Sequence, residues 1–407
     1  MTTSLAASPE LNQITKNRSA RKNVPRRVLI YSADFWPVVG GVQSVVMTLA
    51  RGFAASAQTP ERVECTVVTD TPVGTASDAD LPFRVVRNPG LVELVRLLRR
   101  SDLVHVAGPA LFPLLVSFIL RKPIVVEHHG FQALCPNGLL FHEPTRAACP
   151  GHFLAGHHRE CWKCNADSGY WHSLRLWALT FLRRWCCRFV DANIAPTRWL
   201  DGVLKLPRGF VISHGISERP ASPYPQGNCP TFVFIGRLVS TKGVEVLLDA
   251  AHELSNKGLH FRLVIVGEGP ERGKLERKCK QLELAQTVDF AGYVEEAGVE
   301  SLLRNATAVV MPSLAGEVFG LVAAENMMRG RAVIAPKGGS LAEVVGETGF
   351  TFDAGDARSL AACMEKVLRS PEKAAKMGES ARYYSVKQFS AARMVEDHLT
   401  IYRQVLE

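Results

Sequence analysis

The stretch Phe234-Ile-Gly236-Arg237-Leu-Val-Ser-Thr-Lys242-Gly243 covers the end of a predicted strand and the turn that leads into a predicted helix. The apolar run that leads into it predicts a buried strand, a glycine ends that strand, and a helical pattern starts at Gly243. The same alternation of short apolar runs with longer helical patterns recurs through both halves of the 407-residue chain. This pattern is typical of open parallel sheets, so we predict an α/β fold.

The chain is too long for one ordinary core and suits two domains. Four prolines fall within the thirteen residues 218–230, and proline interrupts both strands and helices, so a linker is predicted there. The predicted parts are a disordered basic N-terminus (1–26), an N-terminal domain (27–216) with a Cys-rich insert (131–170), a Pro-rich linker (217–230), a C-terminal domain (231–385), and a C-terminal helix (386–407) that packs back on the N-terminal domain.

Eleven apolar runs are predicted to be strands of two parallel sheets. Those of the N-terminal domain are Val28–Ser32, Cys65–Thr69, Leu103–Val106, Ile124–His128, Ala192–Ala195 and Phe210–Ser213. Those of the C-terminal domain are Phe232–Ile235, Phe261–Val266, Val288–Phe290, Ala308–Met311 and Ala332–Ala335. Two such domains place a cleft between the facing carboxyl ends of their strands, where sheets of this kind bind ligands.

The positive charge of the chain lies entirely in its first half. Residues 1–210 carry 25 Lys and Arg against 15 Asp and Glu, and the remainder carries 23 against 24, for a net charge of +9. A basic half is compatible with an anionic partner such as a membrane surface, a phosphorylated lipid or nucleic acid, or with a solvated face alone. No run reaches the ~18 apolar residues of a membrane span, and no secretory signal is recognised, so a cytoplasmic location is expected.

The segment Pro312-Ser-Leu-Ala-Gly-Glu317-Val-Phe-Gly-Leu-Val-Ala-Ala-Glu325 follows an apolar strand and opens a helix. The backbone N–H groups of Val318, Phe319, Gly320 and Leu321 would then be free at a helix N-terminus, where they suit a phosphate. The carboxylates of Glu317 and Glu325 accept hydrogen bonds from hydroxyl groups, so the pair is suited to two rings on either side of a diphosphate.

Two further segments offer groups for the same anion. In the unit quoted first, Arg237 and Lys242 lie between a strand and a helix, and two cations there can neutralise a diphosphate without a metal ion. In Asp34-Phe-Trp-Pro-Val-Val-Gly40-Gly41, a glycine pair follows the first strand, and glycine lets the backbone approach an anion closely.

These three motifs, in this order and spacing, resemble those of the family-4 retaining glycosyltransferases (glycosyl transferases group 1) of GT-B fold. The resemblance runs from about Arg27 to the C-terminus and includes Gly338-Gly339 followed by Glu343. It implies two Rossmann-like βαβ domains that face across a cleft, with donor-binding residues Gly40, Gly41, Gly236, Arg237, Lys242, Glu317, Val318, Phe319, Gly320, Leu321 and Glu325.

The resemblance also implies roles for single residues. Arg237 and Lys242 would hold the donor diphosphate, Glu325 the ribose, and Glu317 the hydroxyls of the transferred sugar. A histidine near the sugar is expected after a strand of the first domain, where His129 fits the spacing better than His128. Catalysis would rest on His129, Glu317, Arg237 and Lys242. Of these, Arg237 and Lys242, together with the helix N–H groups, would stabilise the leaving diphosphate without a required cofactor.

The insert contains Cys135, Cys149, Cys161 and Cys164, the last two as Cys-x2-Cys. In a cytosolic protein such a cluster suits a structural Zn²⁺ site that staples a loop. Reduced thiols without a metal ion, or a redox disulfide, are the alternatives. The insert follows His129, so it is expected to overhang the acceptor side of the cleft.

The segment Tyr170–Arg188 combines apolar bulk, aromatic residues and four arginines. It predicts either a helix at a membrane interface or a core helix with an arginine edge.

The partners predicted for the whole chain are a nucleotide-diphosphate sugar, a glycan or lipid-linked acceptor and an anionic membrane surface, without nucleic acid. The rival functions are a nucleotide-sugar epimerase of the same fold and a non-catalytic basic binding protein. The donor base, the sugar and the acceptor are left open.

Overall fold

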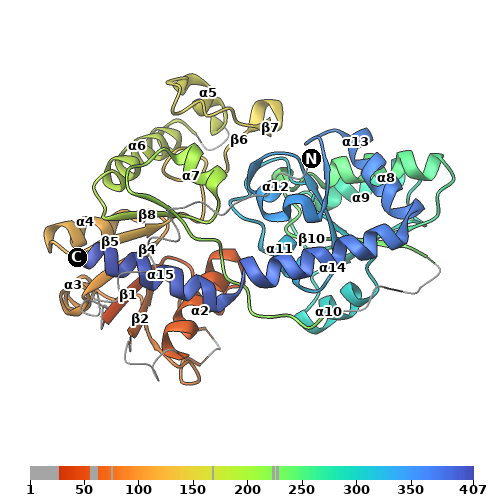
Figure 1. Cartoon of the computed structure of the whole chain (residues 1–407). Coiled ribbons are helices and arrows are strands. Elements are labelled where there is room, and N and C mark those ends of the chain that lie inside the picture. Colours follow the sequence, from red (N-terminus) through yellow and green to blue (C-terminus); the bar gives the residue numbers. More distant parts are fainter. Residues whose placement is uncertain (1–26, 56–62, 75–76, 167–168, 222–224, 226–228) are drawn as a thin grey trace, which may run out of the picture.

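The computed structural model describes residues 27–55, 63–74, 77–166, 169–221, 225 and 229–407 (Figure 1). The predicted disordered N-terminus (1–26) and part of the predicted linker lie outside these residues. The described chain forms two α/β lobes, each built on a parallel sheet. In the part of the chain that is described, every helix is too short or too polar to cross a membrane.

The sheet of the N-terminal domain has seven parallel strands in the order β3-β2-β1-β4-β5-β8-β9. They are β1 (Arg27–Ser32), β2 (Glu64–Thr69), β3 (Arg84–Arg87), β4 (Leu103–Ala107), β5 (Ile124–Glu127), β8 (Ala192–Ala195) and β9 (Gly209–Val211). The helices are α2 (Gly41–Ala55), α3 (Leu91–Arg100), α4 (Leu111–Ile119), α6 (Tyr170–Cys187) and α7 (Arg198–Leu204). The insert adds the hairpin β6 (Phe141–His142) and β7 (Ala147–Ala148), the 3-10 turn η3 (Glu143–Thr145) and helix α5 (His158–Lys163).

The sheet of the C-terminal domain has six parallel strands in the order β12-β11-β10-β13-β14-β15. They are β10 (Thr231–Ile235), β11 (Arg262–Val266), β12 (Val288–Gly292), β13 (Ala308–Val310), β14 (Ala332–Pro336) and β15 (Phe350–Phe352). Around them lie η5 (Ser240–Lys242), α8 (Val244–Asn256), α9 (Arg272–Gln281), α10 (Glu296–Arg304), α11 (Leu321–Met328), α12 (Gly339–Val345), η6 (Gly346–Thr348), α13 (Ala357–Arg369) and α14 (Pro371–Gln388).

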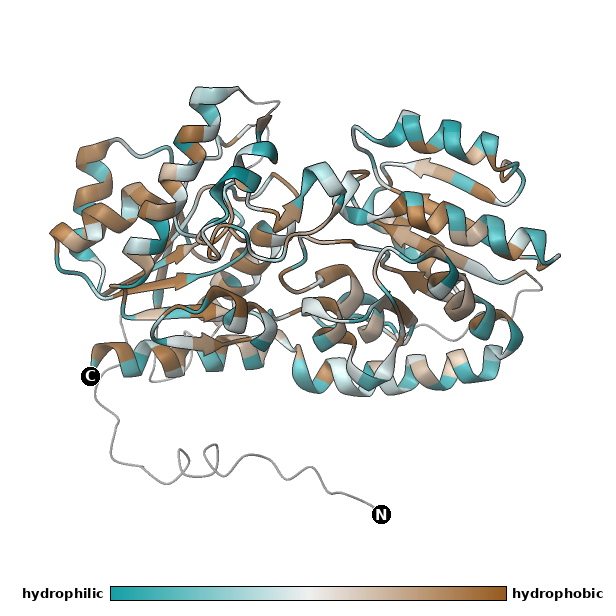
Figure 2. Ribbon diagram, turned by 90° about the horizontal axis from the view of Figure 1, so that it is seen from above, coloured by the Kyte–Doolittle hydropathy of each residue, from teal (hydrophilic) through white to brown (hydrophobic). Residues whose placement is uncertain are grey.

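Apolar side chains explain why these elements form. Helix α2 buries Val45, Val46, Leu49 and Phe53, which recur at helical spacing on one face. The strands carry continuous buried runs, as expected where helices cover both faces of a parallel sheet. Figure 2 shows apolar residues along the strands and on the inner helix faces, with hydrophilic residues on the outer faces.

The last helix, α15 (Ala391–Leu406), returns to the N-terminal domain and packs beside α2 (Figure 1). A Cβ on Gly52 would lie 2.2 Å from a methyl carbon of Val395, so the helices approach closely there because Gly52 has no side chain. Tyr402 is fully buried in the same core. The chain therefore crosses between the domains twice, and the N–H of Ile216 donates to the carbonyl of Phe389, 2.8 Å away, where the crossings meet.

Candidate active site between the two domains

Two of the predicted motifs follow neighbouring strands at the centre of the C-terminal sheet. Strands β10 and β13 pair with each other although they are not consecutive, so the strand order changes direction between them. The segment with Arg237 and Lys242 follows β10, and the segment with Glu317 follows β13. Open α/β sheets bind ligands at the carboxyl ends of such strands, which makes this edge the expected site.

The two segments are joined by hydrogen bonds and one ion pair. The N–H of Leu314 donates to the carbonyl of Thr241 at 2.8 Å. Lys242 Nζ pairs with Glu317 Oε1, and the hydroxyl of Ser313 donates to the same oxygen at 3.0 Å. Both ionic side chains are partly exposed, so the cation and the carboxylate are held together within reach of a ligand.

A cavity of about 220 Å³ lies between the domains beside Glu317. The N-terminal domain contributes Phe131, Leu140, Ala148, Cys149 and Trp199, and the C-terminal domain contributes Ser313, Leu314, Ala315, Gly316, Glu317, Pro336, Lys337, Gly338, Gly339, Ser340, Leu341 and Ala354. The walls are mostly apolar with a few ionic and hydroxyl groups at one side, which is the usual composition of a small-molecule site.

The glycine pair of the N-terminal domain faces the helix that follows Glu317. A Cβ on Gly41 would lie 3.4 Å from Leu321 Cδ1. Helix α11 begins at Leu321, after Gly320 with φ 103°, so Val318 and Phe319 precede its first turn. The N-terminus of α11 thus points toward the Gly40–Gly41 loop, and its free N–H groups lie at the boundary of the domains.

Arg237 and Glu325 are not brought into contact with Lys242 or Glu317. The Arg237 side chain is exposed just past β10, and it has no side-chain partner among the described residues. Burial raises the pKa of Glu325, and Arg329 and Arg219 partly offset that rise. The backbone of Gly267 approaches that of Gly236 closely, because a Cβ on Gly267 would lie 1.9 Å from the carbonyl oxygen of Gly236.

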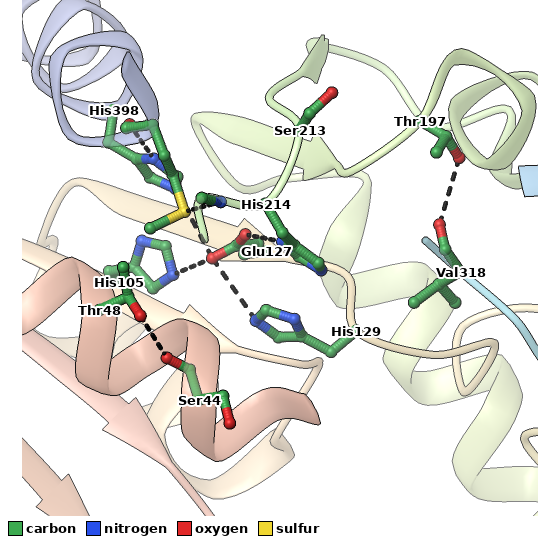
Figure 3. A network of polar contacts seen from close by, with 12 residues as sticks. Ser44, Thr48, His105, Glu127, His129, Thr197, Ser213, His214, Val318 and His398 are labelled. Carbon is green, nitrogen blue, oxygen red and sulfur yellow. Dashed lines mark hydrogen bonds and ion pairs between the residues drawn. The ribbon is translucent and has the colours of Figure 1, made fainter. Parts of the chain in front are cut away.

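His129 belongs to a buried network around one carboxylate, Glu127 at the end of β5 (Figure 3). Glu127 Oε2 lies 3.5 Å from His129 Nε2 and 3.2 Å from His105 Nε2. It also lies 3.6 Å from Nε2 of His398 on α15, and Oε1 lies 3.4 Å from His214 Nδ1. The carboxylate is fully buried, and nitrogen atoms of these four imidazoles lie within 3.2 to 3.6 Å of its oxygens.

The network favours an ionised Glu127. Burial alone would raise the pKa of this carboxyl, but the charge of His129 and hydrogen bonds from His105, His129 and His214 outweigh it and hold the pKa well below its usual range. Burial lowers the pKa of the His105 and His214 imidazoles, which favours their neutral forms. Neutral imidazoles still donate one N–H each, so they can solvate the carboxylate.

His129 and His128 point to different surroundings. His128 is fully buried, its Nε2 lies 3.0 Å from Asn193 Oδ1, and burial lowers its pKa to about 4. The His129 ring stacks on the His214 ring at 5.1 Å, and His214 in turn contacts the ring of Phe319 at 5.1 Å. A column of rings therefore connects His129 with the segment that follows Glu317.

The domains are held together on the far side of the cavity by α7 and α12. Glu343 of α12 accepts from the backbone N–H groups of Arg198 and Trp199 at 2.9 and 2.8 Å, in the first turn of α7. Thr197 Oγ1 lies 2.9 Å from Ser340 Oγ. Ser340 and Glu343 therefore form a contact between the domains, and Gly338 and Gly339 line the cavity beside it.

The Cys-rich insert forms part of the cavity wall. Arg146, at the end of the η3 turn, pairs with Glu271 of the C-terminal domain at 3.2 Å. The carbonyl oxygen of Leu139 would lie 3.7 Å from a Cβ on Gly316. Figure 1 shows β7 near the junction of the two lobes and α5 above the N-terminal lobe.

All ten cysteines of the chain are free thiols. Burial raises the pKa of Cys161 to about 12, with further contributions from Cys135, Cys149 and Cys164. Burial also raises the pKa of Cys135 to about 11, while hydrogen bonds from the backbone of Leu140, Asn137 and Gly138 oppose that rise. The four thiols of the insert therefore belong to one electrostatic cluster.

The sequence did not indicate the partners of His129. Glu127 precedes it directly, but His105, His214 and His398 come from three distant segments, and only their placement on β4, past β9 and on α15 joins them. The sequence predicts a helix over 386–407, but it does not indicate which strand ends this helix covers. Trp199, in the first turn of α7, and Lys337, just past β14, also line the cavity and were missed, because neither belongs to a local motif.

Comparisons with known proteins agree with this arrangement. Residues 218–384 match the family model described as Glycosyl transferases group 1. Alpha-D-kanosaminyltransferase of Streptomyces kanamyceticus is 28% identical over 178 residues, which are 43% of this chain and 46% of that protein. Phosphatidyl-myo-inositol mannosyltransferase of Mycobacterium leprae is 31% identical over 170 residues, 41% of this chain and 44% of that protein. The chain thus spans about half the length of these curated relatives.

The solved structures extend the likeness to both domains. HepE of Anabaena, whose crystal structure contains UDP and glucose, superposes with a TM-score of 0.67 at 18% identity and covers 92% of this chain and 98% of its own. This likeness confirms the prediction of a GT-B fold. The part of the chain that matches the Glycosyl transferases group 1 model, residues 218–384, contains Lys242 and Glu317.

Proposed function

We propose that the chain is a glycosyltransferase that moves a sugar from a nucleotide-diphosphate donor to a hydroxyl group of a glycan or a lipid-linked acceptor. The observation that carries this proposal is the ion pair of Lys242 and Glu317, which lies at the carboxyl ends of β10 and β13 and borders a cavity between the domains. A diphosphate needs a cation, and a sugar needs a carboxylate that accepts from its hydroxyls.

In this proposal the cation and the carboxylate separate when the donor binds. Lys242 turns to the diphosphate together with Arg237, and Glu317 turns to the sugar hydroxyls. The N-terminus of α11 adds its free N–H groups and its dipole on the same side. These groups stabilise the negative charge that grows on the departing nucleoside diphosphate, so the residues require no metal ion for this step.

We assign the retaining mechanism and the family-4 subclass by the same motifs, and we place His129 beside the sugar. The contact of His129 with Glu127 fixes which ring nitrogen faces the cleft, because Nε2 points to the carboxylate and leaves Nδ1 for a ligand. Glu325, which lies one turn into α11, is assigned to the ribose. The relative named phosphatidyl-myo-inositol mannosyltransferase supports a lipid-linked acceptor and a role in glycolipid or cell-surface glycan synthesis.

We also propose that the N-terminal domain contacts an anionic membrane surface from the cytoplasmic side. Helices α4 and α6 lie side by side and leave large apolar side chains exposed. These are Phe112, Leu115, Ile119, Tyr170, Trp171, Phe181, Leu182 and Trp185. Arginines on α6 lie among them, and a face of this composition suits the lipid interface. Sedimentation with vesicles that contain anionic lipid should decrease when Trp171 and Trp185 are both changed to Ser. Equal sedimentation of both proteins would exclude this face.

The first test of the enzyme is thermal stabilisation by UDP, GDP, ADP and their sugar conjugates without added metal. A ligand at about 100 times its Kd stabilises the folded state by about 2.7 kcal/mol, so the donor class raises the unfolding temperature selectively. Arg237→Ala should lose this shift, whereas Arg369→Ala, an exposed arginine at the far end of α13, should keep it. A folded sample that responds to none of these ligands would contradict the proposal and favour the non-catalytic binding protein.

Turnover separates the remaining alternatives. Incubation of the stabilising donor with a candidate acceptor should yield a glycosylated product, and Lys242→Ala should reduce its rate by about two to three orders of magnitude. Lys257→Ala, which removes an exposed ion pair with Glu365, is the control that should retain activity. Conversion of the donor sugar to its epimer in the absence of an acceptor would instead identify the rival epimerase.

A further inference from the structure

The Cys-rich insert has little regular structure to hold it in place. Between His129 and Tyr170 the described residues form two strands of two residues each, one 3-10 turn and one six-residue helix. Buried side chains such as Phe131, Leu134 and Phe141 hold part of this segment, and a bound metal ion would add a further constraint on it. The segment forms one wall of the active-site cavity, so its position matters to the ligand.

The four cysteines of the insert surround one small cavity. Its volume is about 10 Å³, and its lining includes Cys135, Cys149, Cys161, Cys164 and His152. This volume is about the least that one water molecule needs, so the space suits a single small ion and nothing larger. Cys135 and Cys161 are each only 7% exposed, which separates the space from bulk solvent.

Two structural units bring the thiols together. Cys135 precedes a tight turn in which the N–H of Gly138, with φ 71°, donates to the Cys135 carbonyl at 3.0 Å. The N–H of Cys149 donates to the carbonyl of Leu140 at 2.8 Å and so brings the second thiol to the same turn. Cys161 and Cys164 lie in and just after α5, one turn apart. Cys161 and Cys164 have the Cys-x2-Cys spacing of structural zinc sites, whereas Cys135 and Cys149 are distant in sequence and are brought to the same turn by the fold.

We propose that the insert binds one Zn²⁺ through Cys135, Cys149, Cys161 and Cys164. Each thiol releases its proton to solvent on binding, so four thiolates and one dication give a site with a net charge of −2. Backbone N–H groups around Cys135 are donors for such a sulfur, and the buried Nδ1 of His152, which has no hydrogen-bond partner, lies beside the cavity. Donors of this kind are typical partners of metal-bound thiolates.

Binding requires the four sulfur atoms to move closer together. Zinc–sulfur bonds of about 2.3 Å place tetrahedral sulfurs about 3.8 Å apart. The sets of three or more ligand atoms that already lie within 4.8 Å of one another, among the described residues, are the two groups around Glu127 and do not include the cysteines. The Cys135 thiol donates instead to Asn137 Oδ1 at 2.8 Å, and that of Cys164 contacts the Phe141 carbonyl at 3.9 Å. These contacts are replaced when the sulfurs turn to the ion.

The zinc site would set the shape of the active-site cavity. Cys149 lines both the small cavity and the cavity between the domains, and its neighbour Ala148 lines the latter. A zinc ion bound to Cys149 therefore fixes the wall opposite Glu317. The acceptor side of the cleft loses its shape when the metal is removed, whereas the donor groups of the C-terminal domain keep theirs.

Metal analysis of the full-length protein, purified without chelator, tests this inference. One zinc per chain is expected, and the double change Cys161→Ala and Cys164→Ala should reduce it to less than a tenth. Cys229→Ser, an exposed cysteine, and Cys363→Ala, a buried cysteine of the C-terminal domain, are controls that should retain the metal. Zinc below a tenth of an equivalent in the unmodified protein, with no uptake after reduction, would overturn the proposal.

Cobalt and thiol titration make the test independent of variant folding. Co²⁺ added to the reduced, metal-free protein should give the intense thiolate-to-metal charge-transfer absorption of a tetrahedral sulfur site. After chelation in denaturant all ten thiols should react with a thiol reagent. A deficit of two or four thiols would indicate disulfides and overturn the proposal. Stabilisation by a nucleoside diphosphate concerns the other domain, so failure of either proposal is recognised separately.

Discussion

The hydroxyl of Tyr402 lies 2.8 Å from Nδ1 of His105, although 297 positions separate the two residues in the chain. His105 contacts Glu127, and Glu127 contacts His129, so the last helix is connected to the proposed active site through three buried groups. The packing of α15 on the N-terminal domain therefore helps to position the buried groups next to the proposed active site, in addition to covering the core.

Tyr402→Phe should lower the free energy of unfolding by about 1 kcal/mol, because it removes one buried hydrogen bond and leaves His105 Nδ1 without a partner. Urea unfolding at neutral pH measures the change. Tyr383→Phe is the matched control, because Tyr383 is 76% exposed and should behave like the unmodified protein. Equal stability of all three proteins would mean that the Tyr402–His105 contact contributes nothing.

Glu127→Gln should reduce turnover far more than donor binding. The amide has the shape of the carboxylate, but it presents a donor to imidazoles that are themselves donors, so His129 loses its fixed orientation. We expect kcat to fall at least tenfold, a change of pH profile, and an unchanged thermal shift with the nucleoside diphosphate.

The control for Glu127 is Glu93→Gln on the exposed face of α3, which should keep both activity and pH profile. A purely structural role would reduce stability and leave the pH profile of the remaining activity unaltered. That outcome would remove Glu127 from the positioning of His129.

The fold could be predicted to the extent that each element carries its own pattern. Buried strands such as β1 and β10 are continuous apolar runs, and they were recognised. Strands β3 and β15 were missed. The first has two valines between arginines and the second has three residues, and both are edge strands that owe their pairing to a neighbour rather than to their own sequence.

The candidate site likewise has one part that local motifs predict and another part that they do not. Lys242 and Glu317 lie in local motifs, and their two strands are adjacent in the sheet, so the motifs alone placed them together. The carboxylate–imidazole network has no local pattern, since its members meet only after β4, β5 and α15 have packed. The proposal that the four cysteines bind a metal ion rests on their placement around one cavity, which Cys-x2-Cys spacing alone does not predict.

Stability should fall as the pH falls, because of His128. Its pKa in the folded protein is about 4, against about 6.5 in an unfolded chain, so the folded state keeps it neutral while the unfolded state takes up a proton. The contribution is fully present above about pH 6.5 and is lost as the pH falls toward 4, about 3 kcal/mol in all. Burial also lowers the pKa of His105 and His214, so these two residues add to the loss of stability as the pH falls.

Urea unfolding at about pH 7.5 and about pH 5 should show this loss, and His128→Leu should reduce the difference by about 2 kcal/mol. The absolute stability of the variant falls too, because Asn193 Oδ1 loses its partner, so the pH difference is the quantity to compare. His172→Asn, an exposed position on α6, is the control and should leave the difference unaltered. Identical pH dependence in the variant and the unmodified protein would contradict the assignment.

Glu343→Gln tests whether the contact of α12 with α7 holds the domains together. The carboxylate accepts two backbone N–H groups in the first turn of α7, where the helix dipole favours negative charge, and the amide can accept through only one oxygen. We expect the contact to weaken by about 1 to 2 kcal/mol, which increases the population of open molecules.

For the Glu343→Gln protein, small-angle scattering should give a larger radius of gyration without ligand. Addition of the donor nucleotide should restore the compact form, because it binds groups on the C-terminal side and draws the Gly40–Gly41 loop toward α11. Glu347→Gln, in the following 3-10 turn, is the matched control. If both variants scatter like the unmodified protein, closure is set by the insert, with Arg146 on Glu271, and not by Glu343.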